Sequence, residues 1–241
     1  MEHICAHREF ITHTGYVGNK RISVLSTGIG PDNIDIALNE VDALVNIDFE
    51  TRTIKEQKKS VAIIRMGTCG SLQGEVGVDQ LVAGTHGLGI DNLLHFYNLQ
   101  NNEEEKGILA AFESHTQINS HKVFPYIASA SAALIKHFTQ GYNHGITVTC
   151  PGFYAPQGRE VRLKPRFDQL IERLAALQIK GRSLTNFEME TAGYYALGEL
   201  LGHEVLSLNA ILANRPLKKF DSAGEATVSK AIQLALTTFC P

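Results

Sequence analysis

The 241-residue chain has few of the features that mark metalloproteins. Its cysteines are scattered and match no metal-binding spacing; they are Cys5, Cys69, Cys150 and Cys240. The ten histidines are scattered as well. We therefore expect no resident metal or cofactor, and we expect reduced thiols in a cytoplasmic protein.

The chain also has little net charge and no long apolar run. A formal charge of −3 gives no electrostatic footprint for nucleic acid or for an anionic membrane. No apolar stretch approaches the roughly 18–20 residues that cross a bilayer. The first ten residues show no basic segment followed by an apolar one, so no secretion signal is expected. With 44% hydrophobic and 20% charged residues, the composition is typical of globular proteins.

Strand-like and helix-like segments alternate along the chain. Strands are predicted at 21–30, 61–71, 80–86, 145–150 and 204–215, and helices at 31–46, 130–138, 165–177, 188–202 and 222–239. A polar insertion is expected at 48–60, as a solvated helix or loop, and an exposed loop at 98–107. This alternation predicts an α/β fold, in which helices flank a mostly parallel sheet, and one domain over 1–241.

In such a sheet, ligands bind where strands end, and the first glycine-rich strand end is STGIG at 26–30. Gly28 and Gly30 form only part of the dinucleotide-binding pattern, because Asn33 stands at the third glycine position. A tight turn explains these glycines as well as the approach of a ligand does.

The second strand end, IIRMGTCGS at 63–71, carries an arginine in an apolar strand. Burying an unpaired guanidinium is costly, so Arg65 needs a partner. One interpretation is a buried salt bridge. The other is an anion site, in which Arg65 supplies charge while Thr68 and the turn amides supply hydrogen bonds.

The third strand end is NFEMETAGYY at 186–195. Thr185 and Glu188 match a capping box, which is the structural alternative for Glu188. Met189 is of a type found more often in a core than at a ligand. Glu190 has the stronger functional case, because a carboxylate accepts two hydrogen bonds from vicinal sugar hydroxyls.

The loop FYAPQGR at 153–159 combines an aromatic ring, a carboxamide and a guanidinium. Phe153 offers a ring for stacking. Gln157 can meet an N–H and a carbonyl, and Arg159 can donate to a carbonyl oxygen. This set matches the acceptor–donor–acceptor edge of a pyrimidine dione, so the loop is predicted to bind uracil.

Six segments in order resemble uridine phosphorylases of the nucleoside phosphorylase-I family. They are HREF (7–10), STGIG (26–30), IRMGTCG (64–70), FYAPQGR (153–159), NFEMETA (186–192) and ANR (213–215). The resemblance implies a three-layer α/β/α domain with a central mixed sheet. It also implies reversible phosphorolysis of uridine to uracil and ribose 1-phosphate, by homo-hexamers built from dimers.

The resemblance also implies roles for individual residues. The phosphate-binding residues would be Gly28, Arg65, Thr68 and, reaching into the neighbouring subunit, Arg8. The ribose-binding residues would be Met189, Glu190 and Glu188. Phe153, Gln157 and Arg159 would hold the uracil, and catalysis would rest on Arg65, Gln157 and Arg159. Inorganic phosphate is then a co-substrate, and a monovalent cation is possible at the interface near Glu9.

Two departures from the family pattern bear on activity. Purine-cleaving relatives carry a Ser-Asp pair where this chain has Asn214-Arg215, so uracil is favoured over purine bases. The family's Gly-Asp-Pro-x-Arg phosphate loop and its strand are not found, so this chain is expected to be short at its N-terminus. The alternatives are a catalytically impaired nucleoside-binding homologue and, ranked lower, a purine nucleoside phosphorylase or nucleosidase.

Overall fold

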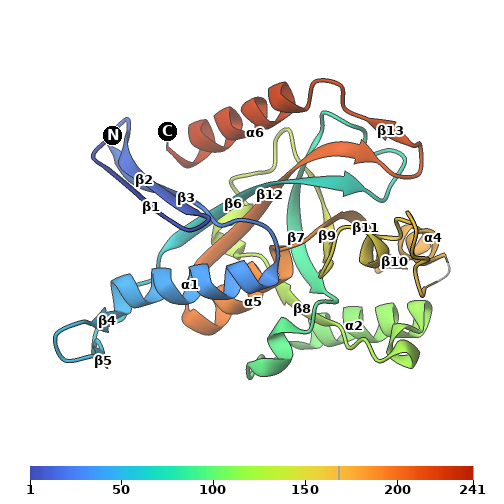
Figure 1. The fold of residues 1–241 in the computed structure, drawn as a ribbon, viewed down its shortest axis with the longest axis horizontal. Coiled ribbons are helices and arrows are strands. Elements are labelled where there is room, and N and C mark those ends of the chain that lie inside the picture. Colours follow the sequence, from blue (N-terminus) through green and yellow to red (C-terminus); the bar gives the residue numbers. More distant parts are fainter. Residues whose placement is uncertain (168, 241) are drawn as a thin grey trace.

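The computed structural model describes residues 1–167 and 169–240, and a mixed β-sheet lies at its centre (Figure 1). Its strands follow the order β13-β12-β6-β11-β9-β7-β8, and β10 pairs with β11 at one side. The bounds are β6 (Ala62–Ser71), β7 (Leu81–Gly89), β8 (Tyr126–Ser129), β9 (Asn143–Thr149), β10 (Gln178–Ile179), β11 (Arg182–Glu188), β12 (Glu204–Asn214) and β13 (Lys219–Phe220).

The sheet contains two parallel groups that run in opposite directions. Strands β6 and β12 are parallel to each other, as are β7, β9 and β11. The groups meet antiparallel where Phe187 of β11 pairs with Gly70 of β6. A second antiparallel pairing, between β12 and β7, closes these strands into a ring. The carboxyl ends of β6 and β11 therefore converge.

Helices cover both faces of the sheet, which confirms the predicted three-layer α/β/α class (Figure 1). One face carries α1 (Pro31–Asn46), α2 (Glu103–Thr116) and α5 (Thr191–Leu201), and the other carries α6 (Gly224–Phe239). Helix α1 begins directly after Gly30 with a proline, a residue that suits the first helical turn. Its buried Ile34 and Leu38 pack in one cluster with Ala192 and Ala196 of α5.

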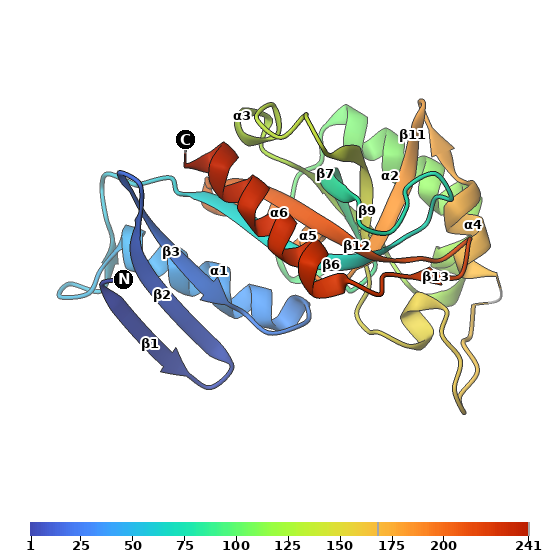
Figure 2. The same cartoon turned by 90° about the horizontal axis from the view of Figure 1, so that it is seen from above.

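A separate three-stranded sheet is formed by β1 (His3–His7), β2 (Phe10–Val17) and β3 (Lys20–Ser26) (Figure 2). Lys20 donates a 2.5 Å hydrogen bond to the carbonyl of Phe239 at the end of α6. His3 and His7 are four residues apart, a spacing that pairs metal ligands on a helix. On strand β1 it separates them by roughly 13 Å.

Several sequence predictions need correction. The polar insertion forms a hairpin of β4 (Ile47–Asp48) and β5 (Thr53–Ile54), and α2 occupies the second half of the predicted loop at 98–107. The Asn102 side chain accepts a hydrogen bond from the Glu105 backbone amide, and the Glu105 side chain accepts one from the Asn102 backbone amide. These two bonds form a capping box at the start of α2.

The predicted helices at 130–138 and 165–177 shrink to α3 (Ala132–Ile135) and α4 (Leu170–Ala176), and residue 168 of the second range lies outside the described residues. Short 3₁₀ turns are η1 (Leu93–Phe96), η2 (Ile118–His121) and η3 (Ala155–Gln157). Across the described residues, none of the helices has the length and apolar character to span a membrane.

Candidate active site

Arg65 lies on the face of β6 that α5 covers, and it is held by four side chains. Its Nη2 is 2.5 Å from Glu190 and 2.9 Å from Glu188, while its Nη1 donates to Asn209 at 2.7 Å and to Ser207 at 3.2 Å. Burial opposes the charge on Arg65, but the two carboxylates outweigh it and raise its pKa. The salt-bridge alternative for Arg65 is therefore present in the structure.

Glu188 joins the ends of β9 and β11 to the start of α5. Its carboxylate accepts from the amides of Glu190 and Thr191 at 2.9 Å and from the Thr149 hydroxyl at 2.6 Å. The predicted capping box with Thr185 is wrong, because Thr185 lies within β11 and donates to the Ser183 carbonyl instead. Glu188 still serves the first amides of a helix, as that alternative supposed.

Glu190 connects Arg65 to the glycine turn before α1. The Gly30 amide donates to its Oε1 at 2.8 Å, and its Oε2 faces Arg65. Burial raises the pKa of Glu190, and the neighbouring Glu188 adds to this, whereas Arg65 acts in the opposite direction. The side chain of Met189, between the two glutamates, is half-buried.

The residues of the predicted uracil loop do come together. Arg159 donates to the Gln157 side-chain oxygen at 2.7 Å and to the Phe153 carbonyl at 2.5 Å, and its guanidinium carbon lies 3.7 Å from the Phe153 ring centre. Gln157 is buried, whereas Phe153 is 53% exposed. One face of the ring is therefore occupied by Arg159 through a cation–π contact.

Arg215 was not predicted as a site residue, yet it lies against this loop. Its Nη2 donates to the Gln157 carbonyl at 2.6 Å. Burial lowers the pKa of Arg159, and the charge of Arg215 adds to the effect. In the sequence, Arg215 belongs to the ANR segment at 213–215, which indicated only that the Asp of purine-cleaving relatives is absent. The preceding Asn214 is structural, since its amide donates to three backbone carbonyls.

Cys150, the residue directly after β9, connects the two groups through the backbone. The Cys150 amide donates to the Glu188 carbonyl at 2.9 Å. Burial raises the pKa of Cys150 well above its ordinary value; the Glu188 carboxylate contributes in the same direction, while Arg159 and Arg215 oppose it. The loop at 153–159, which begins three residues after Cys150, therefore starts beside Glu188 at the carboxyl ends of β9 and β11.

Other predicted phosphate residues are dispersed in this single chain. Gly28 has φ +75°, and a side chain there would meet Asn33. Thr68 is exposed, and strand alternation directs its side chain to the face of β6 opposite Arg65. Arg8 is exposed in the turn between β1 and β2, with φ +53°. The roles of Gly28, Thr68 and Arg8 stay predictions.

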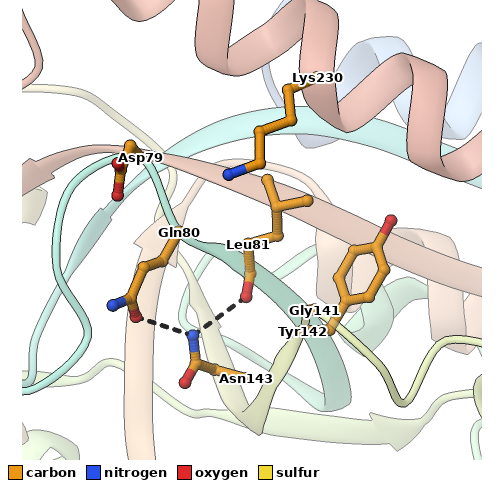
Figure 3. A pocket seen from close by; sticks show the side chains of 7 residues that line it. All are labelled: Asp79, Gln80, Leu81, Gly141, Tyr142, Asn143 and Lys230. Atoms are coloured by element: carbon orange, nitrogen blue, oxygen red, sulfur yellow. Dashed lines mark hydrogen bonds between the residues drawn. The ribbon is translucent and has the colours of Figure 1, made fainter.

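A shallow cavity of about 350 Å³ lies elsewhere, at the amino ends of β7 and β9 (Figure 3). Leu81 and Asn143, the first residues of these strands, line it together with Lys230 of α6. It contains none of the predicted site residues. The candidate active site is at the opposite ends of β7 and β9.

Comparison with known proteins agrees with this architecture. Uridine phosphorylase of Thermococcus kodakarensis is 28% identical over 222 residues, which cover 92% of this chain and 68% of that protein. A DeoD-type purine nucleoside phosphorylase of Buchnera aphidicola is 24% identical, covering 83% and 66%. A Trypanosoma brucei nucleoside phosphorylase, whose crystal structure is described as showing uridine phosphorylase activity, matches with a TM-score of 0.89 at 26% identity, covering 98% of this chain and 85% of that one.

The family model described as the Phosphorylase superfamily matches residues 1–239. This match covers the segments that form both halves of the candidate site, from the glycine turn at 26–30 to Arg215. The chain belongs to the Phosphorylase superfamily.

Proposed function

We propose that this chain is a uridine phosphorylase, which converts uridine and phosphate reversibly to uracil and ribose 1-phosphate. Its relatives include both uridine and purine phosphorylases, so family membership alone does not choose the base. The observation that carries the proposal is the contact of Gln157 with both Arg159 and Arg215, in a loop that starts beside Glu188, a partner of Arg65.

The base-binding half favours a pyrimidine dione. Gln157 presents a carboxamide that both donates and accepts, and Arg159 presents a donor-only guanidinium. Asn214 occupies the position where purine-cleaving relatives are expected to have an acid, and its amide is committed to backbone carbonyls. A uracil anion held by guanidinium groups needs no such acid as it departs.

On the sugar side, we assign the ribose hydroxyls to Glu190, with Met189 against the ring and Glu188 supporting both. Glu190 would exchange its contact with Arg65, or its contact with the Gly30 amide, for the ribose hydroxyls. Phosphate would lie near Arg65, with the turn at Gly28 contributing donors.

The charge balance around Arg65 supports a contribution from a second subunit. Arg65 carries one positive charge against the two carboxylates of Glu188 and Glu190, so the group has a net charge of −1 when all are ionised. A phosphate dianion requires additional positive charge there. Arg8, exposed at the tip of a hairpin, is our candidate to supply it to a neighbour, within hexamers built from dimers that hold a monovalent cation near Glu9.

The reaction then needs alignment and charge stabilisation, without a protein nucleophile. A phosphate oxygen attacks C1′ as the bond to uracil N1 breaks, through a transition state that resembles an oxocarbenium ion. Arg65 and a neighbour's Arg8 hold the phosphate, and Glu190 orients the sugar. Gln157 and Arg159 stabilise the negative charge that grows on uracil, with Arg215 adding a second guanidinium.

The test follows uridine by ultraviolet absorbance with and without inorganic phosphate. The proposal expects uridine to be consumed only when phosphate is present. Binding of uridine without consumption in either condition would contradict it and would favour a non-catalytic nucleoside-binding protein. Consumption that does not depend on phosphate would instead indicate hydrolysis.

A further inference from the structure

The side chain of Arg65 extends forward along its own strand, and its guanidinium lies over Gly67, two residues further on. A Cβ placed on Gly67 would lie 2.5 Å from both Cζ and Nη2 of Arg65, and nearer still to Nη1. Real Cβ atoms essentially never approach another heavy atom within 3.0 Å. The guanidinium therefore occupies the volume that any side chain at position 67 would need.

This glycine is required by space rather than by backbone conformation. Gly28 and Gly30 have φ values of +75° and +106°, backbone conformations that favour glycine whatever lies nearby. Gly67 is not among the positive-φ residues of the described chain, and it lies within the regular parallel pairing of β6 with β12. Alanine at 67 would suit the strand, and the three heavy atoms nearest to its Cβ would all belong to the Arg65 guanidinium.

The guanidinium has little freedom to move aside. In the register of the two strands, Ser207 stands opposite Arg65 and Asn209 opposite Gly67, and both side chains are fully buried. Each accepts a hydrogen bond from Nη1, while Glu188 and Glu190 fix Nη2 from the other side. A methyl group on Gly67 would have to displace Arg65 against these four partners together.

We propose that Gly67 is a positioning residue for phosphorolysis, because the absence of a side chain at 67 leaves the space in which the Arg65 guanidinium lies against Glu190. This inference rests on the proposed function, in which Arg65 binds phosphate. To reach an ordinary contact distance of 3.4 Å from a Cβ at 67, the guanidinium must move by about 1 Å. A misplacement of that size costs on the order of 100-fold in rate.

The experiment compares Gly67→Ala with Gly74→Ala. A Cβ on Gly74 has no heavy atom within 4 Å, so this control adds the same methyl group in open space. We expect Gly67→Ala to lower kcat/KM for phosphate about 100-fold at saturating uridine, with the dissociation constant of uracil changed less than threefold. Gly74→Ala should leave both within threefold of the wild type. A Gly67→Ala enzyme with a phosphate kcat/KM within threefold of the wild type overturns the inference.

A double-mutant cycle with Arg65→Lys separates positioning from general damage to the strand. Lysine lacks the planar fork that lies over Gly67. In the Arg65→Lys background, Gly67→Ala should therefore change phosphate kcat/KM and the urea midpoint by clearly less than in the wild type. If Gly67→Ala changes phosphate kcat/KM and the urea midpoint equally in the two backgrounds, the positioning role of Gly67 is refuted. If Gly67→Ala alone fails to fold, Arg65→Lys should restore folding, and failure to restore it is equally a refutation.

The proposed function can fail separately. A wild-type protein that folds but does not convert uridine with phosphate refutes the reaction alone. The double-mutant cycle measured by urea unfolding still decides whether Gly67 positions the Arg65 guanidinium.

Discussion

Removing Arg159 is the most informative single change in the proposed base-binding half of the site. In the structure its guanidinium joins three parts of the loop, with bonds to the Gln157 side chain and the Phe153 carbonyl and a cation–π contact with the Phe153 ring. Under the proposed function, Arg159→Ala removes a donor aimed at the charge that develops on uracil. A single donor of that kind is worth about 2.7–4 kcal/mol, or 10²–10³ in kcat.

The expected loss lies at the lower end of this range, because Arg215 keeps a second guanidinium beside Gln157. We therefore predict that Arg159→Ala lowers kcat/KM for uridine about 10²-fold, measured by initial rates at saturating phosphate. The matched control is Arg162→Ala, three residues further along the same loop, where the side chain is exposed. A loss below threefold for Arg159→Ala, or equal losses for the two variants, would refute the assignment of the uracil site.

Four further outcomes are expected. Glu190→Gln should reduce kcat/KM for uridine by a larger factor than for 2′-deoxyuridine, and equal losses would make Glu190 structural. Burial raises the pKa of Glu190 above 4.5, so the folded state holds the Glu190 proton more tightly than the unfolded state does. The free energy of unfolding of the wild type, measured with urea, should therefore fall as pH rises through the raised pKa, and it should fall more than that of Glu190→Gln. Arg65→Leu leaves the Glu188 and Glu190 carboxylates buried without a cation and should cost about 3–5 kcal/mol of unfolding free energy; a loss below 1 kcal/mol would contradict the ion-pair network. Burial raises the pKa of Cys69 to about 12, so native-state alkylation should modify exposed Cys5 quickly and Cys69 only after unfolding.

Local patterns in the sequence predicted much of the fold. Helix α1 matches its predicted range because a glycine, a proline and a 3.6-residue apolar period all mark it. Strand β6 was predicted from its apolar run, and the unusual Arg65 within it correctly indicated a buried partner. The loop at 153–159 could be interpreted because its three chemical groups are close in sequence.

Contacts between distant segments were beyond such patterns. The closure of β12 on β7 pairs Leu208 with Ala83, which are far apart in the chain, and leaves no local signal. Arg215 meets Gln157 across 58 residues, so only the fold shows that two arginines share one loop. The buried stripe of α6 is Thr227, Ala231 and Ala235, and the two alanines share a cluster with Leu206 and Leu208 of β12, a contact that the helix sequence alone does not reveal.

The central claim is that this chain transfers ribose from uracil to phosphate. Its most direct test is ³¹P nuclear magnetic resonance of the wild-type protein incubated with uridine and inorganic phosphate. The account predicts a new ribose 1-phosphate signal that grows in step with released uracil, and that disappears when excess uracil drives the reaction back. Release of uracil with free ribose and an unchanged phosphate signal would contradict it.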